Sequence, residues 1–517
     1  MTALDSLEPL EPDIDPSLAA LADAILIPPF FGTTPPPWLL RALDRGLAGV
    51  TFFGSNMTGD TASLTATLRD AAKHGETGAE PVIAIDEEGG DVTRVTYTSG
   101  SPYPGNAALG AVDDVALTRS VYAAIGTDLA RLGINTNLAP CADVLAPDGS
   151  LVVGTRSFGS DPALVARHVA AAVAGLQSAG VAACAKHFPG HGSTAGDSHH
   201  ELATVAGTMQ DLRARDLPPF VAAIGAASLA MMPGHLRVPE LTGELPATLS
   251  PAAITGLLRG ELGFDGVVIC DALEMKAASA AFGIPEAAVL TVIAGTDLLC
   301  LGRDTDEAMY HGVRSALADA VTSGRLSAQR LEEAAARVAG LRARLAAGRG
   351  ASGIPADGAV GAGDGIGLVA ARRALRGSGP VPGPLTDPLV VEVEPEENIA
   401  AGRFPWGFEP WADVLRVDVA AGDGPVLANT VLANTVRTNS AAAAILTAAA
   451  GRSLVLAVRD ARGVLPLIGE LVKVRPDTVL VEMGVPAWTP PPGTSYLASY
   501  GASRACAQAV AEALGLH

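Results

Sequence analysis

The segment DPALVARHVAAAVAGLQSAGVAACAKH (161–187) joins the two patterns that decide the fold. Its first part, residues 161–180, has the apolar spacing of an amphipathic helix. Its last part, VAACAKH (181–187), is a short apolar run that ends in two basic residues. A strand that directly follows a helix of this length is typical of a parallel β-α-β unit. The segment therefore predicts an α/β protein with a parallel sheet.

Outward from this segment, the same alternation of apolar runs and helical patterns fills the first ~345 residues. Eight such runs in one stretch predict a (β/α)8 TIM-type barrel, which we place at residues 1–347. The other seven runs are DAILIP (23–28), GVTFFG (49–54), PVIAID (81–86), INTNLAP (134–140), SLAMMPG (228–234), GVVICD (266–271) and TDLLCLG (296–302).

The remainder of the chain predicts a linker and a second domain. Residues 348–388 are rich in Gly, Ala and Pro and contain one short helical pattern at 368–376, so we assign them as a linker. Residues 389–517 contain buried-strand patterns and a closing helix, which predict a smaller three-layer α/β/α domain. These patterns lie at 389–394, 452–460, 477–484 and 503–515.

Composition excludes several classes of function. The formal net charge of −20 disfavours binding to nucleic acid, whose phosphates it repels. The five cysteines form no CxxC pair, and most lie in or beside apolar runs, as reduced buried cysteines do. The acidic, Pro-interrupted start lacks a signal-peptide pattern, and no apolar run is long enough to span a membrane. We therefore expect a cytoplasmic protein with no membrane partner, and its oligomeric state is not determined by these patterns.

Polar residues follow several of the predicted strands. Because the carboxyl ends of barrel strands face one mouth, these side chains should converge there. Asp271 is the most suggestive, since a carboxylate at a strand end can act as a nucleophile; the alternative is that Asp271 caps the next helix. The polar residues in these positions are Asp86, Asp143, His187, His235 and Asp271.

The segment AKHFPGHGSTAGDSHHELATV (185–205) holds four of the nine histidines. A metal site is one interpretation, but Pro189 and Gly190 would break a helix that carries His187 and His191, so we expect no metal. General acid/base chemistry is another, because Asp197 could orient the imidazole of His199 within a Gly-rich loop. A surface loop with incidental histidines is the third.

Taken in order, KHFPGHG…DSH, ATLSP, LGFDGVVICDALEM and AGTDLLCL resemble family 3 glycoside hydrolases. The DSH loop and IDEEGGDVTR (85–94) resemble the β-N-acetylglucosaminidase branch of that family, and the resemblance spans roughly residues 20–345. NLAPCADV (137–144) and GTRSFGSDP (154–162) also fit, and YLASYGASRACAQAVAEAL (496–514) resembles the end of the family's second domain.

The resemblance implies a retaining, exo-acting enzyme that removes terminal non-reducing N-acetylglucosamine by double displacement. It assigns Asp271 as the nucleophile that forms a glycosyl-aspartate, His199 as the acid/base, and Asp197 as the partner that orients His199. It assigns sugar binding to Asp86, Arg94, Arg156, Lys186 and His187. His200, beside His199, is a bystander by position. No motif implies a cofactor; the Gly-rich GDGIG lies in the linker and follows no strand.

The chain departs from the family pattern at three positions. Ala272 stands where many members have a second Asp, Cys270 replaces a Ser, and Asp91 stands where a basic residue is common. None of these changes removes a catalytic group, but Asp91 bears on substrate selection.

The sequence is compatible with three alternative functions. A neutral His199 would not repel phosphate after the first step, so a phosphorylase is the first alternative. A catalytically inactive sugar-binding protein is the second, and a metal-dependent hydrolase that uses the histidine cluster is the third. The aglycone is open between peptidoglycan fragments and chitin-derived disaccharides.

Overall fold

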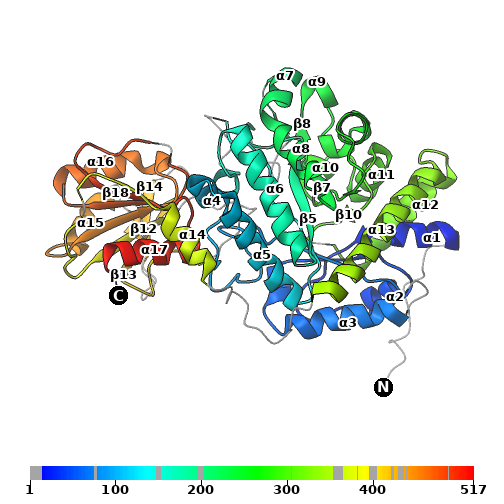
Figure 1. The fold of residues 1–517 in the computed structure, drawn as a ribbon, viewed down its shortest axis with the longest axis horizontal. Coiled ribbons are helices and arrows are strands. Elements are labelled where there is room, and N and C mark those ends of the chain that lie inside the picture. The colour runs from blue at the N-terminus through cyan, green and yellow to red at the C-terminus, as the bar shows by residue number, and fades with distance from the viewer. Residues whose placement is uncertain are drawn as a thin grey trace.

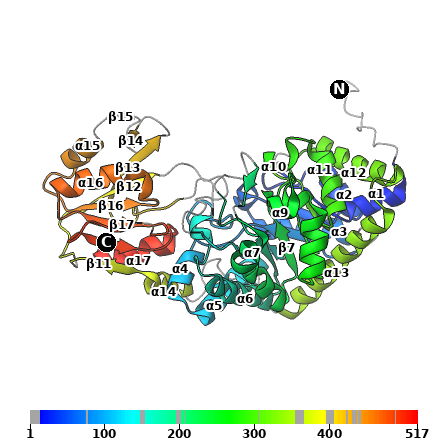
Figure 2. The same ribbon diagram turned by 90° about the horizontal axis from the view of Figure 1, so that it is seen from above.

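The computed structural model describes residues 14–74, 78–146, 153–194, 202–205, 207–303, 305–352, 365–380, 382–394, 405–420, 424–428, 436–437, 441–486 and 488–516. These residues form a larger and a smaller lobe that lie side by side (Figure 1). The view from above shows the C-terminal elements gathered in the smaller lobe (Figure 2).

Each of the eight predicted apolar runs contains one strand of the larger lobe. Six strands form one parallel sheet in the order β2-β3-β4-β5-β7-β9, and β1 pairs in parallel with β10. The strands are β1 (Leu26–Ile27), β2 (Gly49–Phe52), β3 (Val82–Ile85), β4 (Thr136–Asn137), β5 (Ala182–Phe188), β7 (Ala230–Pro233), β9 (Val267–Val268) and β10 (Leu299–Cys300).

Backbone hydrogen bonds close these strands into a ring. Leu298 N donates to Val268 O at 3.0 Å and Cys270 N donates to Leu298 O at 3.0 Å, which joins β9 to β10. Thr51 N donates to Pro28 O at 3.4 Å, which joins the end of β1 to β2. The predicted (β/α)8 barrel is therefore confirmed.

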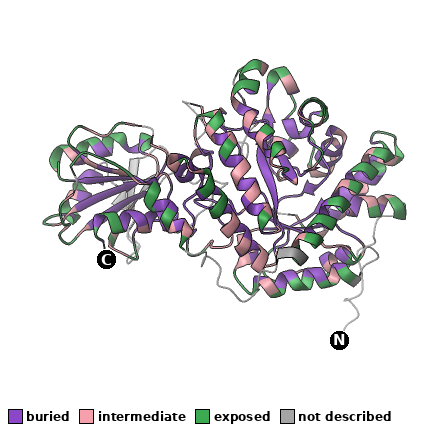
Figure 3. Cartoon of the chain, in the orientation of Figure 1, coloured by how far each residue is buried: buried purple, intermediate pink, exposed green. Residues whose placement is uncertain are grey.

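Helices cover the outside of the barrel, and the strands inside are buried (Figure 3). α6 (Pro162–Ser178) begins where Asp161 accepts a hydrogen bond from Ala163 N and Pro162 fixes the first turn. α6 packs closely on α5 (Val115–Arg131), because at Gly175 an added Cβ would lie 2.5 Å from Arg119 O. The other longer helices of this lobe are α1 (Pro16–Asp23), α2 (Pro37–Asp44), α3 (Thr61–His74), α4 (Asn106–Val112), α8 (Pro218–Gly225), the π-helix at Ala252–Glu261, α11 (Ile284–Ala294), α12 (Glu307–Thr322) and α13 (Ala328–Ser352), and the shorter ones include α7 (Met209–Asp211) and α9 (Pro239–Thr242).

The smaller lobe, here called the C-terminal domain, is a mixed eight-stranded sheet in the order β11-β18-β17-β16-β12-β13-β14-β15. Its central strands are parallel, and β11, β14 and β15 pair antiparallel. The strands are β11 (Arg376–Ser378), β12 (Leu389–Glu394), β13 (Asp413–Ala420), β14 (Gly424–Ala428), β15 (Val436–Arg437), β16 (Leu454–Val458), β17 (Val479–Glu482) and β18 (Ser495–Ala498).

Side chains alternate between the two faces of this sheet. Val455 and Ala457 pack in one apolar cluster with α14 (Ile366–Ala374) and α17 (Arg504–Leu514). Leu454, Leu456 and Val458 pack in another with α15 (Ala441–Ala448) and α16 (Leu465–Val474). Helices on both faces give the three-layer α/β/α architecture that the sequence predicted.

Residues 366–378 occupy part of the segment that the sequence assigned as a linker. α14 packs against α17 and α4, and β11 pairs with β18. This segment therefore contributes packed elements, and the division at residues 347 and 388 stays a prediction. Among the described residues, no helix combines the length and apolar character that a membrane crossing requires.

Candidate active site

A pocket of about 480 Å³ lies beyond the carboxyl ends of the barrel strands. Six residues that the sequence assigned to the site all line it: Asp86, Arg94, Arg156, Lys186, His187 and Asp271. They come from the ends of β3, β5 and β9 and from two loops. The barrel therefore brings together side chains that are up to 185 residues apart in the chain, and the pocket volume suits a small ligand.

Lys186 on β5 is a buried cation that lines this pocket. Its Nζ donates to Asp86 Oδ1 and lies 2.8 Å from Glu88 Oε1, and its side chain is only 3% exposed. Burial lowers the pKa of Lys186, but the two carboxylates outweigh it and hold that pKa above its ordinary value. Lys186 therefore stays charged, and Asp86, which is 23% exposed, presents a carboxylate to the pocket.

Glu88, which the sequence analysis missed, is the anion that joins Lys186 to Arg156. Arg156 Nε and Nη2 donate to its two oxygens at 2.9 and 2.7 Å, in the bidentate arrangement of a strong ion pair. Burial raises the pKa of Glu88, but Arg156 and Lys186 lower it further, so the net pKa lies well below its usual range. Glu88 lies within the motif IDEEGGDVTR, which pointed to this loop. The motif alone does not show which of its two glutamates, Glu87 or Glu88, faces the pocket.

His187 links this ion network to a second carboxylate. Its Nδ1 lies 2.8 Å from Asp143 Oδ2, and Arg156 Nη2 lies 3.3 Å from its Nε2. These partners fit the tautomer in which Nδ1 donates to Asp143 and Nε2 accepts from Arg156. Asp143 also accepts from His191 N at 2.7 Å, so it holds both the end of β5 and the loop that follows it.

Cys141, Asp143 and His187 could also be considered as metal ligands, since one donor atom of each lies within 4.8 Å of the others. Asp143 Oδ2 already accepts from Cys141 Sγ at 3.1 Å and from His187 Nδ1. Burial raises the pKa of the Cys141 thiol well above its ordinary value, which disfavours the thiolate that a metal binds. Hydrogen bonds therefore account for this cluster.

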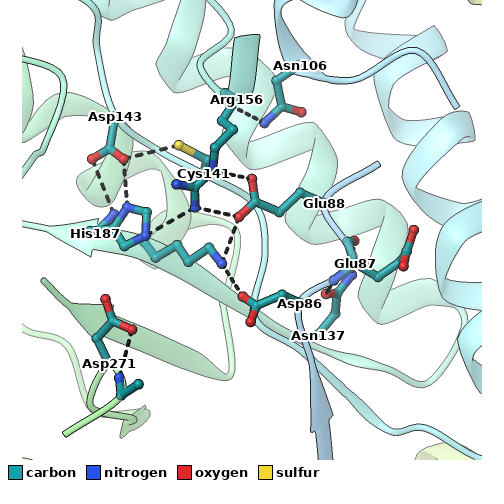
Figure 4. A network of polar contacts seen from close by, with 12 residues as sticks. Asp86, Glu87, Glu88, Asn106, Asn137, Cys141, Asp143, Arg156, His187 and Asp271 are labelled. Atoms are coloured by element: carbon teal, nitrogen blue, oxygen red, sulfur yellow. Dashed lines mark hydrogen bonds and ion pairs between the residues drawn. The ribbon is translucent and has the colours of Figure 1, made fainter. Parts of the chain in front are cut away.

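Asp271 follows β9 and lines the same pocket, and Figure 4 shows it apart from the ion network. Its Oδ1 accepts from Ala272 N at 2.8 Å. His235 braces the same turn, because its Nε2 lies 3.0 Å from Ala272 O and its Nδ1 lies 2.9 Å from Thr248 Oγ1. The next helix, α10 (Lys276–Ser279), begins after Met275. The alternative hypothesis that Asp271 caps that helix is therefore wrong.

Glu87 points away from the ion network and supports the loop that carries Arg94. Its Oε2 accepts from Arg94 N at 2.8 Å and from Val95 N at 2.9 Å. Asn137 on β4 holds the Glu87 backbone, with hydrogen bonds of 3.0 and 2.8 Å to its N and O. Burial raises the pKa of Glu87 to about 7. Glu87 and Glu88 are thus neighbours in sequence with opposite roles.

Asp197 and His199 lie outside the described residues, so their predicted roles are not tested here. Thr194 and Val205 form an antiparallel bridge, and Thr194 Oγ1 lies 2.6 Å from His191 Nδ1 at the pocket. Thr194, the last described residue before this segment, therefore lies beside His191, which lines the pocket.

A closed parallel barrel with a pocket of paired carboxylates and cations at its carboxyl end defines a barrel enzyme. A model of the glycosyl hydrolase family 3 N-terminal domain matches residues 41–341. The chain therefore belongs to glycosyl hydrolase family 3, as its motifs predicted.

Individual relatives extend this assignment. A region of 336 residues is 35% identical to β-hexosaminidase A of Pseudoalteromonas piscicida and covers 60% of this chain, but only 56% of that protein. A family 3 β-N-acetylglucosaminidase from Paenibacillus matches with a TM-score of 0.82 and 30% identity over 96% of both chains. A β-N-acetylhexosaminidase from Beutenbergia cavernae matches with a TM-score of 0.57 and 26% identity over 64% of this chain and all of that one. The chain thus falls in the β-N-acetylhexosaminidase branch that the DSH loop indicated.

Proposed function

We propose that this protein is a retaining, exo-acting β-N-acetylglucosaminidase. The observation that carries the proposal is the convergence of Asp86, Lys186 and Asp271 from three strand ends on one pocket. The match to the Paenibacillus enzyme over 96% of both chains supports the substrate class. The alignment to the Pseudoalteromonas relative spans about half of that protein, so it supports the barrel chemistry only.

The proposed chemistry is a double displacement. The Asp271 carboxylate attacks the anomeric carbon and forms a glycosyl ester, while the bond from that carbon to the leaving oxygen breaks. His199, oriented by Asp197, gives its proton to the leaving oxygen. In the second step His199 removes a proton from water, which attacks the anomeric carbon and releases Asp271. Two inversions retain the β-configuration.

The ion network fits the binding of an uncharged sugar. Asp86 is partly exposed and can accept hydrogen bonds from two neighbouring hydroxyls, while Lys186 donates. Glu88 pairs with Lys186 and holds it in place, and Arg156 holds Glu88 in turn. Because the Lys186 ammonium is already paired with two carboxylates, it attracts an anionic substrate only weakly. It can still donate a hydrogen bond to a neutral sugar.

The direct test compares 4-nitrophenyl β-N-acetylglucosaminide with the corresponding β-glucoside, and follows the anomer of the released sugar by NMR. We expect faster cleavage of the first substrate and initial release of the β-anomer. An equal rate on the glucoside would contradict the substrate class, and initial release of the α-anomer would contradict the mechanism.

The same reaction with added millimolar phosphate separates hydrolysis from phosphorolysis. Free N-acetylglucosamine at a rate independent of phosphate supports the hydrolase. The sugar 1-phosphate, formed at a rate that rises with phosphate, would instead support the phosphorylase alternative. Binding without turnover would support the inactive sugar-binding protein. Disaccharides from chitin and from peptidoglycan then distinguish the two candidate aglycones.

A further inference from the structure

The loop that follows β3 carries Arg94 to the pocket, and the C-terminal domain packs directly on this loop. Ala505 N donates to Ser101 O at 3.3 Å, and Cys506 Sγ lies 3.6 Å from Pro104 O. The contact leaves little space, because an added Cβ at Gly367 would lie 2.0 Å from Pro102 O. Backbone from both lobes therefore meets along residues 100–105.

Asp91 lies at the centre of this contact and is only 7% exposed. Its Oδ1 accepts from Ala502 N at 3.0 Å. Its Oδ2 accepts from Arg459 Nη2 at 3.1 Å and from Thr155 Oγ1 at 2.9 Å. The carboxylate thus binds two segments of the C-terminal domain and one segment of the barrel at once. A buried carboxylate with several donors is held far more firmly than an exposed surface ion pair.

Two barrel segments meet at Asp91: its own loop and the segment that contains Thr155. Both segments contain residues that line the pocket. Arg94, three residues on, lines the pocket, and Arg156, next to Thr155, lines it and binds Glu88. Val92 lines the pocket as well, yet it packs in the apolar cluster of the C-terminal domain together with Trp406. Arg459 lies 5.8 Å from the ring of the same Trp406.

Among the described residues, those that line the pocket all lie between Phe31 and Arg303, and Asp91 is not one of them. The described residues of the C-terminal domain therefore reach the pocket through the barrel loops that they hold and do not line it themselves. Asp91 uses both oxygens for protein donors, so a role in direct contact with substrate does not explain it. Its departure from the basic residue common in the family matches the cation that it faces, Arg459.

We propose that Asp91 is a positioning residue through which the C-terminal domain sets the positions of Arg94 and Arg156 against the substrate. This inference rests on the proposed function, because substrate binding is its readout. It also gives the C-terminal domain a part in the reaction, whereas the Beutenbergia relative matches only 64% of this chain over its whole length.

The test uses the full chain with Asp91→Asn, Arg459→Gln, Arg459→Lys and the double variant Asp91→Asn/Arg459→Gln. For 4-nitrophenyl β-N-acetylglucosaminide we expect each neutral variant to raise KM on the order of tenfold, because displaced binding groups lose contact with the sugar. We expect kcat to change less than KM. Arg459→Lys should restore part of the affinity.

The double variant shows whether the two residues act as one unit. We expect its KM to be no higher than that of the worse single variant, since the same contact is lost only once. Arg452→Gln is the matched control, because Arg452 pairs with Asp413 and Asp387 inside the same domain. Its KM should equal that of the wild type.

Three outcomes would overturn the inference. They are an unchanged KM in the neutral variants, strictly additive losses in the double variant, and an equal rise of KM in Arg452→Gln. Thermal unfolding is measured in parallel, because a purely structural role would lower Tm without moving KM. If the wild type and Arg452→Gln fail to turn over the substrate, the proposed function has failed. The affinity of each variant for N-acetylglucosamine, measured by titration calorimetry, then still decides whether Asp91 positions the pocket.

Discussion

Both lobes contain parallel strands whose carboxyl ends point to a functional edge, but the two edges are used differently. In the barrel, residues after β3, β5 and β9 line an open pocket. In the C-terminal domain, Arg459 follows β16 and Ala502 follows β18, and both bind Asp91 of the barrel. Parallel α/β sheets usually bind ligands at this edge. Here a loop of the barrel occupies that position, so the same architecture serves catalysis in one lobe and docking in the other.

The largest effect should follow from Asp271→Asn at the barrel edge. Removal of the proposed nucleophile should lower kcat/KM by roughly four orders of magnitude or more without a change in Tm. A fluorosugar that traps the ester should label Asp271, as peptide mass spectrometry can show. Asp265→Asn, in the exposed turn before β9, is the control. Label on any other residue would show that Asp271 is not the nucleophile. The contrast between a catalytic edge in the barrel and a docking edge in the C-terminal domain would then be weaker.

Lys186→Met should affect activity and stability together, because Lys186 is both buried and paired. The change leaves Asp86 and Glu88 without this shared cation, and breaking a buried ion pair typically costs about 3–5 kcal/mol. Urea denaturation and kcat/KM measure the two effects. Lys276→Met, at an exposed site, should change neither. A Lys186→Met variant with normal stability would show that the network does not depend on this lysine.

Glu87 offers a test in pH. Burial raises its folded-state pKa from 4.5 to about 7, so it favours the folded state fully below pH 4.5, and this contribution is lost as the pH rises to about 7. Glu87→Gln removes the titration. From pH 5 to 7.5 the stability of the wild type should therefore fall relative to the variant, by about 1.4 kcal/mol for each pKa unit. Parallel curves of Tm against pH would show that Glu87 does not titrate in this window.

The smallest effect is expected from Glu392→Gln on the C-terminal sheet. Glu392 is fully buried, accepts from Phe408 N at 2.5 Å and pairs with Arg416 at 3.1 Å. Loss of its charge should cost about 1 kcal/mol of stability and leave kcat/KM within about twofold of the wild type. A large loss of activity in folded protein would mean that the C-terminal sheet contributes more than the docking of Asp91.

The barrel was predictable because its strands are buried on both faces and therefore form continuous apolar runs. The strands of the C-terminal sheet were harder to predict from the sequence. Strands such as β13, with the sequence DVLRVDVA, alternate with charged residues, and β18 is only four residues long. The sequence patterns consequently indicated three of its eight strands.

Site residues at strand ends were also predictable, since strand ends converge in any barrel. Glu88 was not assigned a role, because that role depends on which of two neighbouring glutamates faces the ion network. Asp91 was noted only as a departure that bears on substrate selection, because its contact depends on a partner 368 residues away. Periodicity along the chain contains no information about either. The structure supplies it by bringing Arg459 and Thr155 to the same carboxylate.

Val92 belongs to the apolar core of one lobe while its backbone belongs to the other. The C-terminal domain cannot lose its structure without exposing this side chain, and the barrel loop cannot shift without disturbing that core. We therefore expect a ligand in the pocket to raise the resistance of the C-terminal domain to heat and protease. A ligand in the pocket should then slow amide hydrogen exchange in α15 and α16, although neither helix lines the pocket.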